Sequence, residues 1–87
     1  TFRSKAYLAF IASLPCAVCG AEPTVPHHER FGKGGTGIKP PDSHCIPLCF
    51  GCHTQRHAEG VETFWAAFDP KMLCIEYLTR HLETKGL

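Results

Sequence analysis

The sequence lacks a long apolar run, and it has almost no excess of one charge. No stretch is apolar and long enough to span a bilayer, and no apolar targeting segment opens the chain. We therefore expect no membrane partner and a reduced, cytoplasmic environment. Nine Lys and Arg residues face eight Asp and Glu residues, so the formal net charge is only +1. Composition alone does not indicate a general polyanion-binding protein.

The chain is also short. Its 87 residues predict a single domain, residues 1–87, and a domain of this size buries too little surface to rely on an apolar core. Six cysteines could stabilise it as disulfides or as metal ligands. Four of them form two separated Cys-x-x-Cys pairs, "CAVC" and "CFGC", a spacing typical of zinc ribbons. We therefore favour one structural zinc site over disulfides, with the ligands Cys16, Cys19, Cys49 and Cys52.

Other signals predict a helix at each end of the chain. Ser4 is a suitable N-cap for a helix over residues 4–13. Near the other end, Asp69 as N-cap, Pro70 at the first helical position and Gly86 at the end delimit a second helix. Its apolar stripe is predicted at Met72, Leu73, Ile75, Leu78 and Leu82.

Between these helices the sequence predicts strands and a further helical region. Residues 25–31 and 44–49 read as two strands, joined by a loop rich in glycine and proline. Residues 50–60 should be helical, followed by a short helix over residues 61–68. We expect Trp65 and the phenylalanines, including Phe64 and Phe68, to lie in the core. The two remaining cysteines, Cys45 and Cys74, should also be buried, whereas His81 should lie at the surface.

The histidines call for a separate explanation. Neighbouring strand residues point to opposite faces, so His27 and His28 should have different roles. His53 and His57 lie one helical turn apart and can ligate one ion together, with a strand histidine as third ligand. Three protein ligands would leave coordination positions open for water and substrate.

The motifs "HH", a glycine-rich loop and "PLCFGCH", with a histidine four residues later, together resemble the HNH endonucleases. The resemblance covers residues 16–57 and is nearest to the zinc-stapled phage and prophage type, including the RecA-dependent Ref-like nucleases. It implies an α+β ββα-metal (His-Me) finger with a structural four-cysteine zinc site, flanked by N-terminal and C-terminal helices. The implied activity is metal-dependent hydrolysis of DNA phosphodiester bonds.

Carried over to this chain, the resemblance assigns the histidines. It implies that His27, His53 and His57 hold one divalent catalytic ion, which is Mg, Mn, Zn or Ni, and that His28 is the general base. The family's middle Asn is absent, and either His44 or Asp42 could stand in for it.

The resemblance also implies DNA as partner, with basic residues near the histidines contacting phosphate. A recombination protein or phage partner and a bacterial or phage-infected cytoplasm fit the same family. One alternative is a non-catalytic zinc-finger nucleic-acid-binding module on the same scaffold. A thiol redox protein is a weaker one, because no βαβ pattern surrounds the cysteine pairs. The predicted phosphate contacts are Arg30, Lys33, Lys39 and Arg56, with Arg30 or Arg56 as a clamp in the active site.

Overall fold

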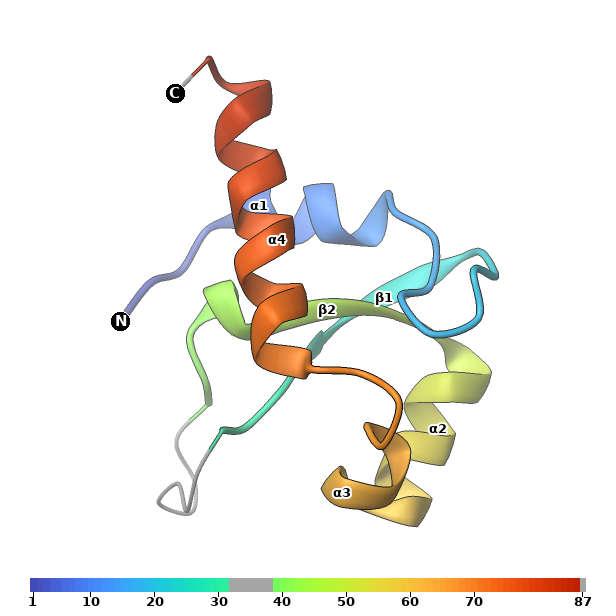
Figure 1. Ribbon diagram of the computed structural model, residues 1–87. Coiled ribbons are helices and arrows are strands. Elements are labelled where there is room, and N and C mark those ends of the chain that lie inside the picture. The colour runs from blue at the N-terminus through green and yellow to red at the C-terminus, as the bar shows by residue number, and fades with distance from the viewer. Residues whose placement is uncertain (32–38, 87) are drawn as a thin grey trace.

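A computed structural model describes residues 1–31 and 39–86, and it is built around two antiparallel strands. Strand β1 (Thr24–His28) pairs with β2 (Cys45–Cys49), with His27 opposite Ile46. Helices pack on both faces of this pair (Figure 1). They are α1 (Lys5–Ala12), the 3-10 helix η1 (Asp42–His44), α2 (Phe50–Glu59), α3 (Val61–Phe64) and α4 (Pro70–Thr84).

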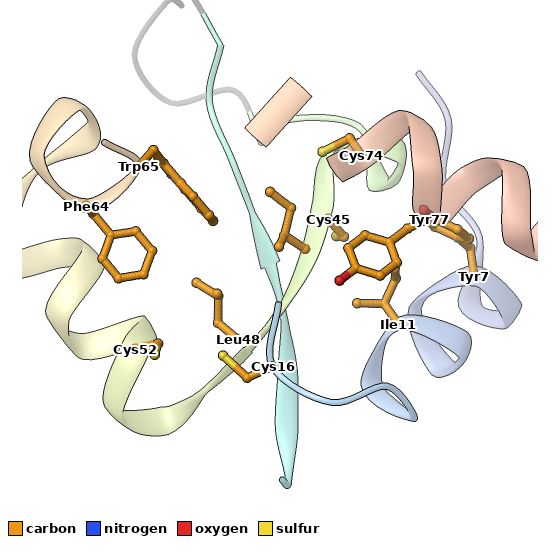
Figure 2. Packing of buried hydrophobic residues seen from close by; sticks show 11 residues of the cluster. Tyr7, Ile11, Cys16, Cys45, Leu48, Cys52, Phe64, Trp65, Cys74 and Tyr77 are labelled. Carbon is orange, nitrogen blue, oxygen red and sulfur yellow. The ribbon is translucent and has the colours of Figure 1, made fainter. Parts of the chain in front are cut away.

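The two faces of the sheet carry different helices and different parts of the core. Tyr7 and Ile11 of α1 pack with Tyr77 of α4 on one face, while Leu48 points toward Phe64 on the other (Figure 2). Alternation along β2 explains this division, because successive side chains point to opposite sides. We call the two sides the α1/α4 face and the α2 face.

The helix termini follow the predicted capping signals. The Ser4 hydroxyl accepts a hydrogen bond from the backbone N–H of Tyr7 at the start of α1. The Asp69 carboxylate caps α4, with Pro70 at its first turn. Gly86 has a φ of 76°, a left-handed conformation that glycine adopts without steric cost and that commonly ends a helix. The prediction of helices flanking the domain is therefore confirmed.

The predicted apolar stripe of α4 is wrong in part. Met72 and Ile75 are each 57% exposed, and Leu82 is also exposed. The buried positions of α4 are Cys74, Tyr77 and His81. These residues follow the i, i+3, i+7 spacing of one helix face. Because His81 is polar, the sequence did not indicate that it belongs to the buried face.

Burial differs from expectation at several other residues. His81 is buried against α1, with its ring 5.0 Å from that of Tyr7, rather than lying at the surface. Trp65, Phe64, Cys45 and Cys74 are buried as expected. The phenylalanines outside the core are Phe2, Phe50 and Phe68.

The strand over residues 25–31 is shorter than predicted and shifted by one residue, since β1 runs from Thr24 to His28. The glycine-rich stretch and Lys33 lie outside the described residues. Within the described part of the chain, no helix combines the length and the apolar character that crossing a membrane requires.

Candidate functional site

The four paired cysteines converge on one point, as the zinc prediction requires. Cys16 and Cys19 lie after α1, and Cys49 and Cys52 lie at the junction of β2 and α2; their sulfur atoms are all within 4.8 Å of one another. The Cys19 and Cys49 sulfurs are 3.6 Å apart. Tetrahedral zinc with Zn–S bonds of about 2.3 Å places sulfurs about 3.8 Å apart. The cluster could therefore hold a structural metal such as zinc.

The local backbone shapes this cluster for sulfur ligands. Gly20 has a φ of 79°, which lets the turn after Cys19 close, and the N–H of Gly20 donates to the Cys16 carbonyl. At the other pair, the backbone N–H of Cys52 donates to the Cys49 sulfur at 3.4 Å. All six cysteines are free thiols, so disulfide bonds do not hold the fold together.

Without a metal, the thiols of this cluster do not ionise equally. Burial opposes charge on Cys16, but backbone N–H groups outweigh it and lower the pKa of this thiol to about 6. Burial and the neighbouring sulfurs raise the pKa of Cys52. Four thiolates this close repel one another, so a divalent cation is needed to keep all of them ionised.

A second cluster lies on the α2 face, where three histidines meet. His27 from β1 reaches His53 and His57 from α2, and one ligand atom of each lies within 4.8 Å of the others. The Nε2 atoms of His53 and His57 are 3.3 Å apart, which is the spacing of two ligands bound at about 2.0 Å to one tetrahedral ion. Burial and the other two imidazoles lower the pKa of His53. Neutral rings with unprotonated nitrogens are the form that binds a metal.

Glu29 contacts His27 of this histidine trio, a role that sequence reasoning missed. It is fully buried and accepts two hydrogen bonds from Arg56, at 2.9 and 2.6 Å, and one from the Trp65 indole. Its Oε1 also lies 3.4 Å from His27 Nε2. Burial alone would raise the pKa of Glu29, but the bonds from Arg56, His27 and Trp65 lower it to about 2.

An ionised Glu29 fixes the orientation of the His27 ring. A carboxylate only accepts hydrogen bonds, so His27 Nε2 carries the proton and Nδ1 keeps the lone pair for a metal. The spacing of Glu29 two residues after His27, which puts both on one strand face, was the available signal.

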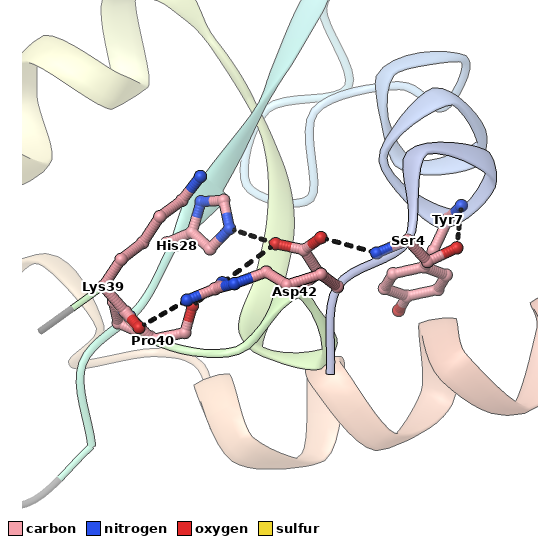
Figure 3. A network of polar contacts seen from close by, with 7 residues as sticks. Ser4, Tyr7, His28, Lys39, Pro40 and Asp42 are labelled. Carbon is pink, nitrogen blue, oxygen red and sulfur yellow. Dashed lines mark hydrogen bonds and ion pairs between the residues drawn. The ribbon is translucent and has the colours of Figure 1, made fainter. Parts of the chain in front are cut away.

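A third feature lies on the α1/α4 face, where His28 meets Asp42. His28 Nε2 is 2.8 Å from Asp42 Oδ1. The Asp42 carboxylate also accepts from the Ser4 N–H at 2.8 Å and from the Arg3 guanidinium at 3.2 Å (Figure 3). Although burial acts against ionisation, these bonds lower the pKa of Asp42, with His28 making the largest contribution among them. Its charge makes His28 Nε2 the protonated nitrogen and leaves Nδ1 as the basic one.

Arg3 is the second residue that sequence reasoning missed. Besides Asp42, its guanidinium donates to the carbonyls of Lys39 and Pro40. The carbonyl of Phe2 accepts from the Asp42 N–H. The N-terminal segment therefore holds the chain around Asp42 in place, through contacts that span nearly forty residues of sequence.

The other predicted site residues occupy different places. His44 does not pair with His28: its ring contacts Phe31, and its Nδ1 is buried without a hydrogen-bond partner. The Arg56 guanidinium donates through Nε and one terminal nitrogen to Glu29, and its predicted phosphate contact stays a prediction. The Arg30 and Lys39 side chains are exposed, and Lys33 falls outside the described residues.

One more group of potential ligands, His28, Asp42 and Cys45, is less suited to a metal. Its ligand atoms also lie within 4.8 Å of one another. However, burial raises the pKa of the Cys45 thiol to about 12, and Asp42 already accepts three hydrogen bonds. We therefore treat His28 and Asp42 as a hydrogen-bonded dyad.

The fold and these clusters define a small α+β protein with a potential four-cysteine metal site. Residues 1–83 match the family described as "Protein of unknown function (DUF968)", so the chain belongs to that family. It is also similar to the "Uncharacterized protein YdfU" of Escherichia coli (strain K12), with 38% identity over 56 residues. That match covers 63% of this chain and 16% of the relative. No solved structure matches significantly.

Proposed function

We propose that this protein is a metal-dependent HNH endonuclease that hydrolyses DNA phosphodiester bonds on a ββα-metal finger. The observation that carries the proposal is the convergence of His27, His53 and His57. His28, the next residue of β1 after His27, faces the buried carboxylate of Asp42. The resemblance of residues 16–57 to the HNH endonucleases assigns the same residues to these roles. Cys16, Cys19, Cys49 and Cys52 hold a structural zinc ion in this proposal.

The chemistry needs a nucleophile and stabilisation of charge on the phosphate. His27, His53 and His57 would hold a divalent ion, which would supply Lewis acidity toward the phosphodiester. His28 Nδ1 takes a proton from the attacking water as the new P–O bond forms and the bond to the leaving sugar oxygen breaks. Asp42 holds the His28 ring in the tautomer that this step requires and stabilises the imidazolium that results.

The two faces of β1 both contribute to the proposed site. His27 and His28 are consecutive, so their Cα atoms are about 3.8 Å apart while their rings leave opposite sides of the strand. Within the described residues β1 pairs only with β2, so its other edge forms no ladder with a strand. In this proposal, the phosphodiester lies across that edge, between the trio on one side and His28 on the other.

Plasmid nicking with Mg, Mn, Ni or Zn, compared with EDTA, tests this function. The variant His28→Ala should lose about 10²-fold or more in rate, the usual contribution of a general base. Thr54→Ala, an exposed position between His53 and His57 on α2, is the control for His53→Ala and His57→Ala and should nick normally. DNA binding without metal-dependent nicking would instead identify the non-catalytic zinc-finger module.

A further inference from the structure

A pocket of about 400 Å³ lies beside α4 and has no part in the function proposed so far. Phe31, which follows β1, forms one side, and Ser43 and His44 of η1 also line the pocket. The rest of the lining comes from α4, namely Lys71, Cys74, Ile75 and Leu78.

The lining is mainly apolar and includes an aromatic ring with a cation beside it, which suits a flat, aromatic ligand that carries negative charge. The Phe31 ring meets the His44 ring edge-on at 5.0 Å, and the Lys71 ammonium lies 5.8 Å from the centroid of Phe31. Ile75 is 57% exposed, so the pocket presents apolar surface to solvent. A nucleobase has an apolar face for these walls and an attached phosphate for the Lys71 ammonium.

The pocket also lies next to the His28–Asp42 dyad. Ser43 and His44 directly follow Asp42 in η1, and Phe31 is three residues beyond His28, which spans at most about 10 Å of extended chain. His28 and η1 belong to the same face of the sheet as α4. One nucleic-acid strand can therefore contact the dyad and the pocket together.

We propose that this pocket binds one unpaired base of the DNA strand whose phosphate lies at His28. This inference rests on the proposed nuclease function and specifies its substrate, namely DNA with an unstacked or single-stranded nucleotide beside the cleaved bond. Such a substrate exposes the base face that a duplex keeps stacked.

Two variants of α4 separate the pocket from the rest of the helix. Ile75→Glu places a charge in the pocket, and Met72→Glu places the same charge on the same helix at a residue that is equally exposed but does not line the pocket. Both are made in the His28→Ala background, so that DNA stays intact, and circular dichroism checks that both fold. Fluorescence anisotropy then measures binding of a short single-stranded oligodeoxynucleotide, either intact or with one abasic nucleotide.

We expect Ile75→Glu to weaken binding of the intact oligonucleotide about tenfold, with little change for Met72→Glu. An abasic nucleotide at the position that the pocket binds should weaken binding by a similar factor in the protein that carries only His28→Ala. It should not weaken binding further in the protein that also carries Ile75→Glu. Equal effects of the two variants, or indifference to every abasic position, would overturn the base site. Self-association that Ile75→Glu abolishes, measured by sedimentation, would show a second copy as the occupant and would also overturn it.

The same variants without the His28→Ala change distinguish this inference from the proposed function. Nicking that is equal in Ile75→Glu and Met72→Glu would refute the pocket while the nuclease stands. Pocket-dependent binding of the base by a protein that nicks under no metal condition would support the pocket and refute the nuclease.

Discussion

Two carboxylates are buried in the described part of the chain, and each of them faces a histidine of β1. Glu29 contacts His27, and Asp42 contacts His28. Both carboxyl groups have a lowered pKa because cationic and N–H partners outweigh burial. At the scale of single residues, the adjacent histidines are therefore oriented by two separate anions, one on each face of the sheet.

Asp42→Asn tests whether the carboxylate orients His28. The substitution keeps the size of the side chain but removes the charge that requires a proton on Nε2, and an Asn amide can donate to that nitrogen and favour the wrong tautomer. We expect the nicking rate to fall about 10²-fold, with zinc content unchanged.

Asp69→Asn is the matched control, because it makes the same chemical change at the N-cap of α4. Asn and Asp cap helices almost equally well, so both activity and stability should stay near those of the parent protein. If Asp42→Asn nicks as fast as Asp69→Asn, the carboxylate has no part in the reaction.

Glu29 should make stability depend on pH in acid. Its pKa falls from an ordinary 4.5 to about 2 on folding, so its stabilisation is complete above pH 4.5 and is lost as pH falls toward 2. The shift corresponds to about 3 kcal/mol. We expect Glu29→Gln to be less stable by about that amount near neutral pH, and the gap to shrink in acid.

Urea unfolding of the two proteins at the same free zinc concentration measures this gap at about pH 7, 5 and 3. Zinc content is measured at each pH, and the two proteins are compared only where both keep the metal, because the fold is expected to depend on it. Glu59→Gln, at an exposed residue, provides the control. A gap that stays constant down to pH 3 would assign the stabilisation to the shape of the side chain rather than to its charge.

At the scale of the element, α4 shows what the sequence could and could not predict. Its start and end follow from Asp69, Pro70 and Gly86 because capping depends on local backbone chemistry. Its buried face did not follow, because His81 and Tyr77 turn inward against α1 while apolar residues remain outside. Which side of a helix is buried depends on its partner, and the sequence does not name the partner.

The same distinction holds for the candidate sites. The cysteine spacing and the i, i+4 histidine pair are local patterns, and both led to groups of residues that the structure brings together. The Glu29–Arg56 pair and the Arg3–Asp42 contact join residues 27 and 39 positions apart. Contacts at such separations depend on the pairing of β1 with β2 and on the docking of the N-terminal segment, so no local motif indicated them.

Tyr77→Ala tests the buried face of α4. Tyr77 is 8% exposed and belongs to the core cluster, so truncation should cost about 3 kcal/mol or more through lost burial and a residual cavity. Met72→Ala, on the exposed side of the same helix, should change the free energy of unfolding by about 0.5 kcal/mol or less. Denaturant unfolding at fixed zinc measures both free energies of unfolding. Similar losses for the two variants would contradict the buried face described here and support the predicted apolar stripe.

At the scale of the whole molecule, the four-cysteine cluster joins segments from the two sides of the sheet. Cys16 and Cys19 follow α1 on one side of the sheet, while Cys49 and Cys52 begin α2 on the other. A two-stranded sheet is marginal alone, and a domain this small has a limited core. Because the site forms only when these segments meet, the free energy of binding a metal such as zinc there would contribute directly to folding.

Cys49→Ser should therefore abolish both zinc binding and cooperative unfolding. Cys49 is at once a ligand and the N-cap of α2, and a serine hydroxyl can replace the cap but not the thiolate. Cys74→Ala removes a buried thiol outside the cluster, so it should keep zinc and lose only about 1–2 kcal/mol. Zinc content by atomic absorption and thermal unfolding by circular dichroism give the two readouts. A zinc-free Cys49→Ser protein that still unfolds cooperatively would show that packing of the helices on both faces of the sheet is sufficient for the fold.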